Sequence, residues 1–184
     1  MKWLVVLALL VKLSSPGPVL YVQRRVGRGY RRFGCIKFRT MRADADQVLS
    51  RVLAESPDMR AEFERDFKLR QDPRITPIGR FLRRSSLDEL PQFLNVLLGE
   101  MSVVGPRPIV DKEIQRYGPF MDEVLAVRPG LTGLWQVSGR NNLSYPKRVR
   151  LDVAYARGRS LRLDLAIILR TFGVLLLPMD RGAY

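Results

Sequence analysis

Two adjacent carboxylates, Asp88 and Glu89, stand in the most arginine-rich part of the chain. A carboxylate can attack phosphorus or hold a metal ion, and guanidinium groups bind phosphate oxygens through paired hydrogen bonds. This combination of residue types therefore suits chemistry on a phosphate group. The surrounding arginines are Arg80, Arg83, Arg84 and Arg107.

The same residues also have a purely structural interpretation. Ser86 and Glu89 have the spacing of a capping box, which would begin a helix before an apolar run. Pro91 would then fall at the fifth helical position, where its missing N–H removes a hydrogen bond. With Asp88 as the cap, Pro91 falls within the first turn and is tolerated. The structural and chemical interpretations can hold together, because a helix N-terminus also binds anions.

The composition points to an anionic partner. The 184 residues suffice for one domain with a hydrophobic core, and they carry a formal net charge of +14 at pH 7. Candidate partners are nucleic acid, anionic lipid and a phosphorylated substrate. The absence of histidine excludes histidine-based catalysis, and the lone Cys35 excludes an internal disulfide. A metal ion would need oxygen ligands, which favours Mg²⁺ or Mn²⁺.

The elements that must position these groups begin with an apolar N-terminal segment. Residues 3–13 would form a helix about 16 Å long, roughly half of the ~30 Å hydrocarbon core of a bilayer. The segment is either a buried core helix or one that dips into the membrane. Trp3 and Lys12, as residues typical of the interface, favour the second alternative. The sequence SSPGP at residues 14–18 ends the helix.

The remainder predicts an α+β fold that is mostly helical, with a small β-hairpin and amphipathic helices. The strands of the hairpin, 19–23 and 35–40, flank a turn rich in glycine and arginine. Ser56 and Pro57 divide a charged helical stretch, 44–70, into two helices. Further helices are predicted at residues 78–84, 93–98, 109–127, 146–155 and 161–177. The helix 109–127 is expected to break at Gly118–Pro119.

Basic and polar residues elsewhere are candidates for ligand binding. Lys37 and Arg39 alternate on one face of the second strand, which could also be an ordinary solvated face. Prolines on both sides restrict the backbone of Arg107. The loop 128–141 contains three glycines in ten residues, which permits close approach of a ligand, although a plain surface loop has the same composition. Its polar residues include Thr132, Gln136, Arg140 and Asn141.

Short motifs in this order and at this spacing resemble the bacterial sugar transferase family, the monotopic phosphoglycosyl transferases. The resemblance covers nearly the whole chain. Any one motif is weak, whereas four in register are highly specific. The motifs are KFRTM at residues 37–41, SLDELPQ at 86–92, GPRP at 105–108 and RPGLTG at 128–133.

The resemblance implies an enzyme that transfers a sugar-1-phosphate from a UDP-sugar to undecaprenyl phosphate, giving undecaprenyl-diphosphate-sugar and UMP. It implies a two-step mechanism in which Asp88 is the nucleophile and forms a phosphosugar-aspartate intermediate. Glu89 is implicated with Mg²⁺, and both Asp88 and Glu89 are candidate metal ligands. The residues implied in phosphate binding are Arg83, Lys37, Arg39 and Arg107, and those implied in nucleotide binding are Thr132, Gly133, Gln136 and Arg140.

The resemblance also implies a location at the cytoplasmic face of the bacterial inner membrane, as a monotopic protein in contact with anionic lipid. The reaction would be the first membrane step of exopolysaccharide, O-antigen or glycoconjugate assembly. Residues 1–18 would be a membrane-dipping helix and its exit, truncated relative to the family's re-entrant helix, and 19–184 the catalytic domain. The identity of the sugar stays open, as does the choice between a monomer and a homo-oligomer.

Two other functions fit the charge alone. A nucleic-acid-binding module would need base-stacking aromatic residues among its basic ones, and Tyr30 and Phe38 form no clear platform, so no nucleic-acid partner is expected. A non-catalytic scaffold at the membrane surface would explain the charge and the apolar ends of the chain. It would leave the Asp88–Glu89 pair without a role.

Overall fold

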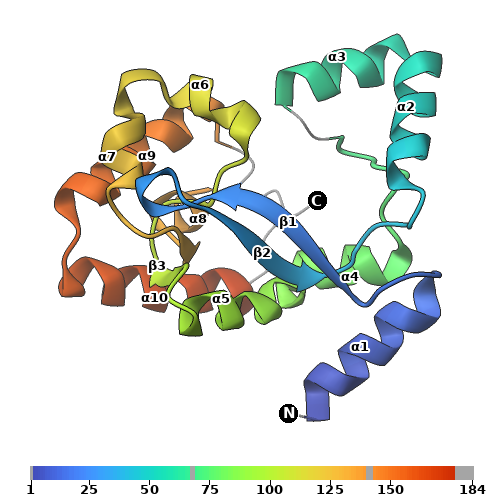
Figure 1. Cartoon of the computed structure of the whole chain (residues 1–184), viewed down its shortest axis with the longest axis horizontal. Helices are drawn as coiled ribbons and strands as arrows, with labels where there is room; N and C mark the ends of the chain where they lie inside the picture. Colours follow the sequence, from blue (N-terminus) through green and yellow to red (C-terminus); the bar gives the residue numbers. More distant parts are fainter. Residues whose placement is uncertain (1, 67–68, 140–142, 177–184) are drawn as a thin grey trace. The chain divides into compact units, whose positions relative to one another are not determined.

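The computed structural model describes residues 2–66, 69–139 and 143–176. These residues form two compact units. The first unit takes in residues 2–21 and 38–88, and the second takes in residues 22–37 and the described residues from 89 onward. The prediction of a mostly helical structure with a small hairpin is confirmed (Figure 1).

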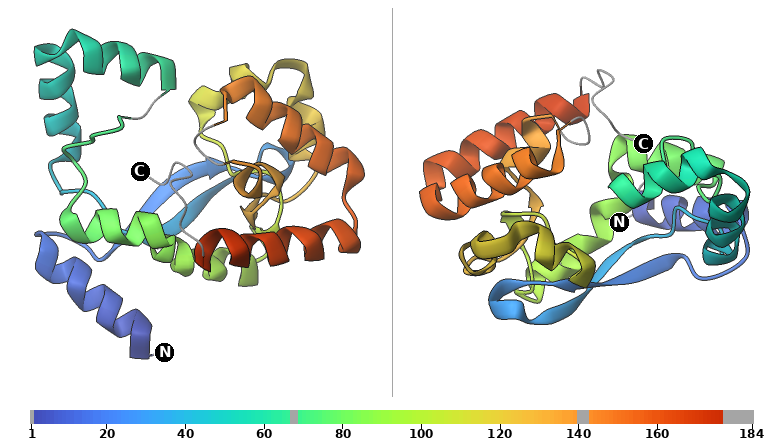
Figure 2. Two further views of the ribbon diagram at one scale, coloured as in Figure 1. Left: turned by 180° about the vertical axis from the view of Figure 1, so that it is seen from behind. Right: turned by 90° about the horizontal axis from the view of Figure 1, so that it is seen from above.

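The hairpin consists of β1 (Leu20–Val26) and β2 (Arg32–Phe38), which pair with one another. A short 3₁₀ turn, η1 (Arg28–Tyr30), joins them. Both strands extend further toward the turn than the predicted ranges 19–23 and 35–40. The hairpin is therefore a long twisted ribbon with a tight end (Figure 2).

Helices make up most of the first unit. Val11, Phe38 and Leu82 form its buried cluster, which brings the N-terminal helix against the helix that precedes Asp88. Pro57 begins a new helix at the predicted break, and the helices on either side of it meet at a sharp angle (Figure 1). The helices of this unit are α1 (Lys2–Ser14), α2 (Ala45–Glu55), α3 (Pro57–Asp66) and α4 (Pro77–Ser85).

Helix α4 has well-defined ends. The hydroxyl oxygen of Thr76 accepts a hydrogen bond from the N–H of Gly79 at 3.0 Å, so Thr76 is the N-cap. Ser86 ends the helix in the left-handed region, at φ 56°. The chain continues as a 3₁₀ helix, η2 (Leu87–Gln92), which contains Pro91. Ser86 also directly precedes η2 and so occupies the position of the predicted capping box, but its backbone is left-handed rather than extended as is typical of an N-cap. The capping box stays a prediction.

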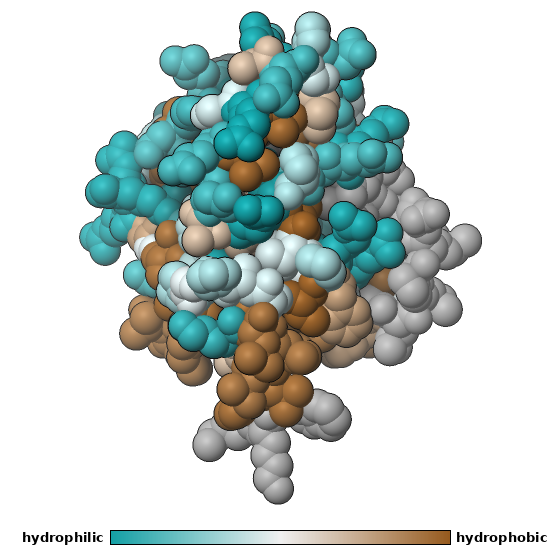
Figure 3. All heavy atoms as spheres, turned by 90° about the vertical axis from the view of Figure 1, so that its right-hand side faces the viewer, coloured by the Kyte–Doolittle hydropathy of each residue, from teal (hydrophilic) through white to brown (hydrophobic). Residues whose placement is uncertain are grey.

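Helix α1 presents apolar side chains to solvent. Leu13 is 82% exposed, and the apolar side chains near the lower end of the view in Figure 3 form a brown cluster. Among the described residues, no helix has both the length and the apolar character needed to cross a bilayer. The re-entrant membrane helix stays a prediction. The exposed apolar residues of α1 are Leu4, Val5, Val6, Leu9, Leu10 and Leu13.

The second unit contains a small parallel sheet that the sequence pattern does not predict. Strands β3 (Ser102–Val104) and β4 (Gly130–Thr132) pair in parallel, with Ser102 opposite Gly130 and Val104 opposite Thr132. Three residues are too few to show an alternating pattern. The prediction of a loop without regular structure at 128–141 is wrong for its described part, since β4 and α8 (Leu134–Val137) lie within it. Its predicted role in ligand binding stays a prediction.

Short helices surround this sheet. The predicted helix 109–127 is a series of short helices that turns at Gly118, where a break was expected. Tyr155 and Ile167 pack with Val104 and so bring two longer helices onto β3. The helical elements are α5 (Phe93–Leu97), η3 (Asp111–Glu113), α6 (Ile114–Tyr117), η4 (Gly118–Phe120), α7 (Met121–Leu125), α9 (Tyr145–Gly158) and α10 (Leu161–Leu176).

The pairing of β3 with β4 depends on a close approach at Gly130. A Cβ atom there would lie 2.1 Å from the backbone nitrogen of Gly105 and 2.4 Å from the carbonyl oxygen of Thr132. Replacing Gly130 by alanine should lower the free energy of unfolding by about 2 kcal/mol or more, because backbone atoms must move apart. Urea unfolding followed by circular dichroism measures the change.

The matched control is Gly173→Ala in α10, where an added Cβ meets no atom within 4 Å. This variant should be unchanged or up to about 1 kcal/mol more stable, because alanine favours the helix. Equal stability of the two variants would contradict the close-packed pairing of the strands.

Candidate active site

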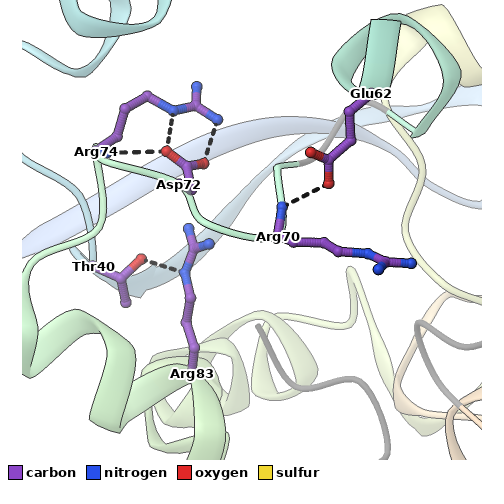
Figure 4. Close-up of polar contacts among 6 residues, drawn as sticks. All are labelled: Thr40, Glu62, Arg70, Asp72, Arg74 and Arg83. Carbon is purple, nitrogen blue, oxygen red and sulfur yellow. Dashed lines mark hydrogen bonds and ion pairs between the residues drawn. The ribbon is translucent and has the colours of Figure 1, made fainter. Parts of the chain in front are cut away.

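An arginine-lined pocket lies in the first unit, where the loop after α3 meets α4. Its volume is about 590 Å³. Figure 4 shows Arg70, Asp72 and Arg83 in this region. The excess of guanidinium groups makes the lining of the pocket positively charged, which suits an anion such as phosphate. The lining residues are Arg70, Gln71, Asp72, Pro73, Ile75, Arg80, Arg83 and Arg84.

A buried ion pair fixes the loop that forms one side of the pocket. Nη2 of Arg74 lies 2.6 Å from Oδ2 of Asp72, and Nε of Arg74 donates to Oδ1 at 2.8 Å (Figure 4). The backbone N–H of Arg74 also donates to Oδ1, at 3.0 Å. Nearer α3, the backbone N–H of Arg70 donates to Oε1 of Glu62 at 2.8 Å. These bonds tie Arg70, Asp72 and Arg74 to their neighbours at this side of the pocket.

Arg83 enters the pocket from the last turn of α4. Its Nε donates to the hydroxyl of Thr40 at 2.9 Å (Figure 4). Burial lowers the pKa of Arg83, and the charges of Asp88 and Asp72 partly oppose that shift. The guanidinium nevertheless stays charged at neutral pH. Thr40 thus fixes the Nε side of the guanidinium, and the positive charge of Arg83 contributes to the lining of the pocket.

Thr40 is itself fixed by the start of α4. Its carbonyl oxygen accepts the backbone N–H of Thr76 at 3.0 Å. A Cβ on Gly79 would lie 2.0 Å from that same oxygen, so only glycine allows α4 to pack this closely. Thr40 of the KFRTM motif therefore packs directly against the start of α4. The sequence alone does not predict this contact.

Asp88 lies just beyond α4, at the second position of η2, and is only 8% exposed. It is close enough to Arg83 for its negative charge to act on that guanidinium. This charge interaction lies within the first unit, while the catalytic role of Asp88 and the phosphate-binding role of Arg83 stay predictions. Glu89, the next residue in the chain, belongs to the second unit.

Arg39 lies in the first unit, and its side chain is directed to the end of α1. It is buried, and its guanidinium donates to the carbonyl oxygens of Ser15, at 2.6 Å, and Pro16. These bonds satisfy carbonyl groups after the last turn of the helix. A phosphate contact by Arg39 stays a prediction. Lys37, half-buried on β2, belongs to the second unit, and its charge acts on the buried thiol of Cys35.

The Gly105–Pro108 turn is held through its backbone by β4. The N–H of Gly105 donates to the carbonyl of Thr132 at 2.9 Å, and the carbonyl of Pro106 accepts the N–H of Gly130 at 2.8 Å. The GPRP and RPGLTG motifs, which lie far apart in sequence, are thus parts of one structure. A Cβ on Gly105 would lie 2.4 Å from the carbonyl oxygen of Arg128, so the close approach of the two motifs requires glycine there.

The side chain of Arg107 leaves this turn over an aromatic ring. Its guanidinium carbon is 5.6 Å from the ring centroid of Trp135, and that of Arg148 is 5.2 Å from the same centroid. Trp135 is buried, so both guanidinium groups are held beside an apolar surface. Nε of Arg148 donates to the carbonyl of Leu143 at 3.1 Å, which fixes its approach.

A buried carboxylate, Asp152 of α9, faces the backbone of the same turn. It is 1% exposed, and Oδ2 accepts the hydroxyl proton of Tyr117 at 2.8 Å. Burial raises the pKa of Asp152 to about 7, while Tyr117 and the backbone N–H of Arg107 act in the opposite direction. Burial also raises the pKa of Tyr117, which keeps its hydroxyl protonated as a donor.

The residues predicted to bind nucleotide lie around β4 and α8. The hydroxyls of Thr132 and Thr171 are 2.8 Å apart, and a Cβ on Gly133 would lie 2.2 Å from the carbonyl oxygen of Gly105. Oε1 of Gln136 is buried without a hydrogen-bond partner among the described residues. The geometry thus gives Thr132 and Gly133 a packing role as well. Arg140 lies outside the described residues.

The predicted Mg²⁺ ligands, Asp88 and Glu89, stay a prediction. Within the described ranges, histidine, cysteine and acidic side chains form no group of three or more that could hold a metal ion. Mg²⁺ is usually bound through one or two carboxylates together with substrate phosphates and water. Asp88 and Glu89 fit that mode of binding, since it needs no larger protein cluster.

Comparison with known proteins decides the family. The model of the family described as bacterial sugar transferase matches residues 1–178. The chain belongs to the bacterial sugar transferase family. The predicted resemblance is thereby confirmed over nearly the whole length.

Similar sugar transferases have informative names. The chain is 50% identical over 181 residues to the UDP-galactose-lipid carrier transferase of Erwinia amylovora. These aligned residues make up 98% of this chain and 37% of the relative. It is 52% identical over 168 residues to the undecaprenyl-phosphate galactose phosphotransferase of Salmonella typhimurium, covering 91% and 35%. It is 48% identical over 175 residues to the exopolysaccharide production protein ExoY of Rhizobium meliloti, covering 95% and 76%. The chain thus spans little more than a third of the first two relatives.

Several functional candidates escaped the sequence-based prediction. Arg25 is buried on β1 beside the Gly105–Pro108 turn, Trp135 lies beneath Arg107, and Asp152 faces the backbone of the turn. Each looks ordinary in sequence, because basic residues on strands and acidic residues on helices are usually solvated. A long-range contact map would have been needed to find them.

The raised pKa of Asp152 predicts a pH-dependent stability. The folded protein binds a proton at Asp152 between about pH 4 and pH 7, where the unfolded chain does not, so stability falls as pH rises through this window. The slope due to Asp152 is up to about 1.4 kcal/mol per pH unit. Asp152→Asn still accepts from Tyr117 but cannot ionise, so it should lack this part of the decline.

Urea unfolding of both proteins at pH 5 and pH 7 measures the difference. The free energy of unfolding of the wild type should fall relative to that of Asp152→Asn by about 2 kcal/mol. Parallel pH profiles for the two proteins would contradict a buried, proton-binding Asp152.

Proposed function

We propose that this chain transfers a sugar-1-phosphate from a UDP-sugar to undecaprenyl phosphate, giving undecaprenyl-diphosphate-sugar and UMP. The family membership and the names of the Erwinia and Salmonella relatives support the donor, the acceptor and the reaction. The name of the Rhizobium relative supports a role in exopolysaccharide production, and O-antigen or glycoconjugate assembly remain the alternatives of the proposal. The reaction would be the first membrane step of that assembly.

One structural observation carries the mechanism. Asp88 is a buried carboxylate whose charge acts on Arg83, and Arg83 lines a pocket rich in arginine. A buried carboxylate is poorly hydrated and is therefore a better nucleophile than one in water. The arginines attract the phosphate that it would attack.

In the first step, a carboxylate oxygen of Asp88 attacks the phosphorus that bears the sugar. A new oxygen–phosphorus bond forms, and the bond from that phosphorus to the bridging oxygen breaks. The bridging oxygen leaves with its electron pair as part of UMP. Arg83, held by Thr40, stabilises the negative charge on the phosphoryl oxygens during the displacement.

In the second step, an oxygen of undecaprenyl phosphate attacks the same phosphorus. The Asp88–phosphorus bond breaks, its electron pair returns to the carboxylate, and the lipid diphosphate sugar is released. Splitting the transfer in this way replaces one difficult displacement by two easier ones. The same arginine pocket serves both steps, because both substrates present phosphate oxygens to it.

Mg²⁺ fits the chemistry of the site, with Glu89 and Asp88 as its protein ligands. When bound, it would neutralise charge on the diphosphate oxygens and so ease departure of UMP. Lys37, Arg39 and Arg107 are the further phosphate contacts in this proposal, and Thr132, Gly133, Gln136 and Arg140 are the nucleotide contacts.

The lipid acceptor requires a site at the bilayer. The exposed apolar residues of α1 suit insertion into the apolar layer of the bacterial inner membrane, as a monotopic dip (Figure 3). The net charge of +14 suits the anionic lipids of the cytoplasmic leaflet. We therefore place the active site at the cytoplasmic face, where the UDP-sugar is available.

Release of UMP from a panel of UDP-sugars, with undecaprenyl phosphate and Mg²⁺ in detergent, tests the proposal. Asp88→Asn should lower the rate by at least about a thousandfold, because the amide is a poor nucleophile. Asp58→Asn is the matched control, since Asp58 is exposed on α3, and it should retain the wild-type rate. Chelation of Mg²⁺ should abolish release.

Release that continues in Asp88→Asn, or that is independent of undecaprenyl phosphate during steady turnover, would refute the proposed function. The UDP-sugar with the highest kcat/KM would identify the sugar.

A further inference from the structure

Arg25 is a buried cation that the proposed mechanism does not use. It lies on β1 and is 7% exposed, whereas its neighbour Arg24 is exposed. Burying a guanidinium is costly unless its charge and its N–H groups are satisfied. The contacts of Arg25 therefore indicate what the chain gains from keeping it there.

The guanidinium of Arg25 reaches the Gly105–Pro108 turn. Nη1 donates to the carbonyl oxygen of Pro108 at 2.8 Å and lies 3.7 Å from Oε2 of Glu113. Nη2 donates to Oε1 of Gln23 at 2.7 Å. Oε2 of Glu113 in turn accepts the N–H of Val110 at 2.9 Å, so the ion pair also fixes the chain that leaves the turn.

These contacts do not fully offset the cost of burying the charge and the N–H groups of Arg25. Nε of Arg25 is buried without a hydrogen-bond partner among the described residues. Burial and the like charge of Arg107 lower the pKa of Arg25 to about 10, and the charges of Glu113, Cys35 and Glu89 act in the opposite direction. Arg25 is thus protonated at neutral pH and stands close enough to Arg107 for the two charges to repel.

A purely structural role explains this arrangement poorly. A neutral donor could bind the Pro108 carbonyl without placing a second positive charge beside Arg107. Like charges held together become favourable when an anion binds between or beside them, because the anion relieves their repulsion. The two neighbouring positive charges therefore favour binding of an anion at Arg107.

We propose that Arg25 is a positioning residue, which holds the backbone of Arg107 through Pro108 and raises the positive potential at Arg107 for the diphosphate of the nucleotide donor. This inference rests on the proposed function, which supplies the nucleoside diphosphate. Arg25 does not contact the substrate. Its effect on binding passes through Arg107.

A double-mutant cycle on the affinity for UDP tests this assignment. UDP binding is measured by titration calorimetry on the detergent-solubilised chain, with Arg25→Met, Arg107→Met and the double variant. Each single variant should bind UDP about tenfold more weakly. The double variant should be within about twofold of Arg107→Met, because Arg25 acts through Arg107.

Arg24→Met is the matched control, and it should bind UDP as the wild type does. Arg25→Lys, which keeps the charge, replaces Arg25→Met in the cycle if the methionine variant does not fold, and it should recover part of the affinity. In the transfer reaction the loss should appear as a raised KM for the UDP-sugar. A loss of folded enzyme alone would lower the apparent kcat and leave KM unchanged.

The outcomes separate the two proposals. Multiplicative losses in the double variant, or Arg25→Met binding UDP as Arg24→Met does, would overturn the role of Arg25 and leave the transferase reaction standing. A wild-type chain that neither binds UDP nor releases UMP would overturn both.

Discussion

The backbone of the Gly105–Pro108 turn is the constraint on which the second unit depends. The strand that follows Pro129 bonds to Gly105 and Pro106, Arg25 bonds to Pro108, and the N–H of Val26 donates to Ile109 at 2.9 Å. Proline restricts the backbone dihedral angles of the turn, and these hydrogen bonds restrict its backbone further. The side chain of Arg107 therefore starts from a fixed point, which is the condition for preorganised binding of an anion.

In the first unit, a threonine rather than a proline-rich turn fixes the position of an arginine side chain. Thr40 receives the start of α4 at its carbonyl and Arg83 at its hydroxyl, so one residue sets both the helix and the guanidinium. The left-handed Ser86 then turns the chain into η2 and brings Asp88 within range of Arg83. Fixed cations beside a buried carboxylate favour phosphate chemistry, because no reorganisation is needed when charge develops.

Local sequence predicted what depends on local forces. The break at Pro57 and the hairpin follow from turn residues and alternation. The pairing of the GPRP and RPGLTG motifs did not follow, because parallel strands of three residues carry no periodic signal.

Burial was harder still to predict from the sequence. Nothing in the sequence marks Arg25, in an arginine-rich hairpin, or Asp152, in a helix, as buried. Arg25 nevertheless bonds to the turn at Pro108, and Asp152 bonds to Tyr117. Such residues break the usual rule that charged side chains are exposed, and violations of that kind are most often found where function requires them.

The covalent role of Asp88 is the central claim, and mass spectrometry of the intact chain tests it most directly. The chain is mixed with its preferred UDP-sugar and Mg²⁺, without undecaprenyl phosphate, and quenched rapidly. The account predicts a mass increase of one phosphosugar, located on the peptide that contains Asp88, and its disappearance when the lipid is added. An unchanged mass in a preparation that is active once the lipid is present would show direct transfer and contradict the account.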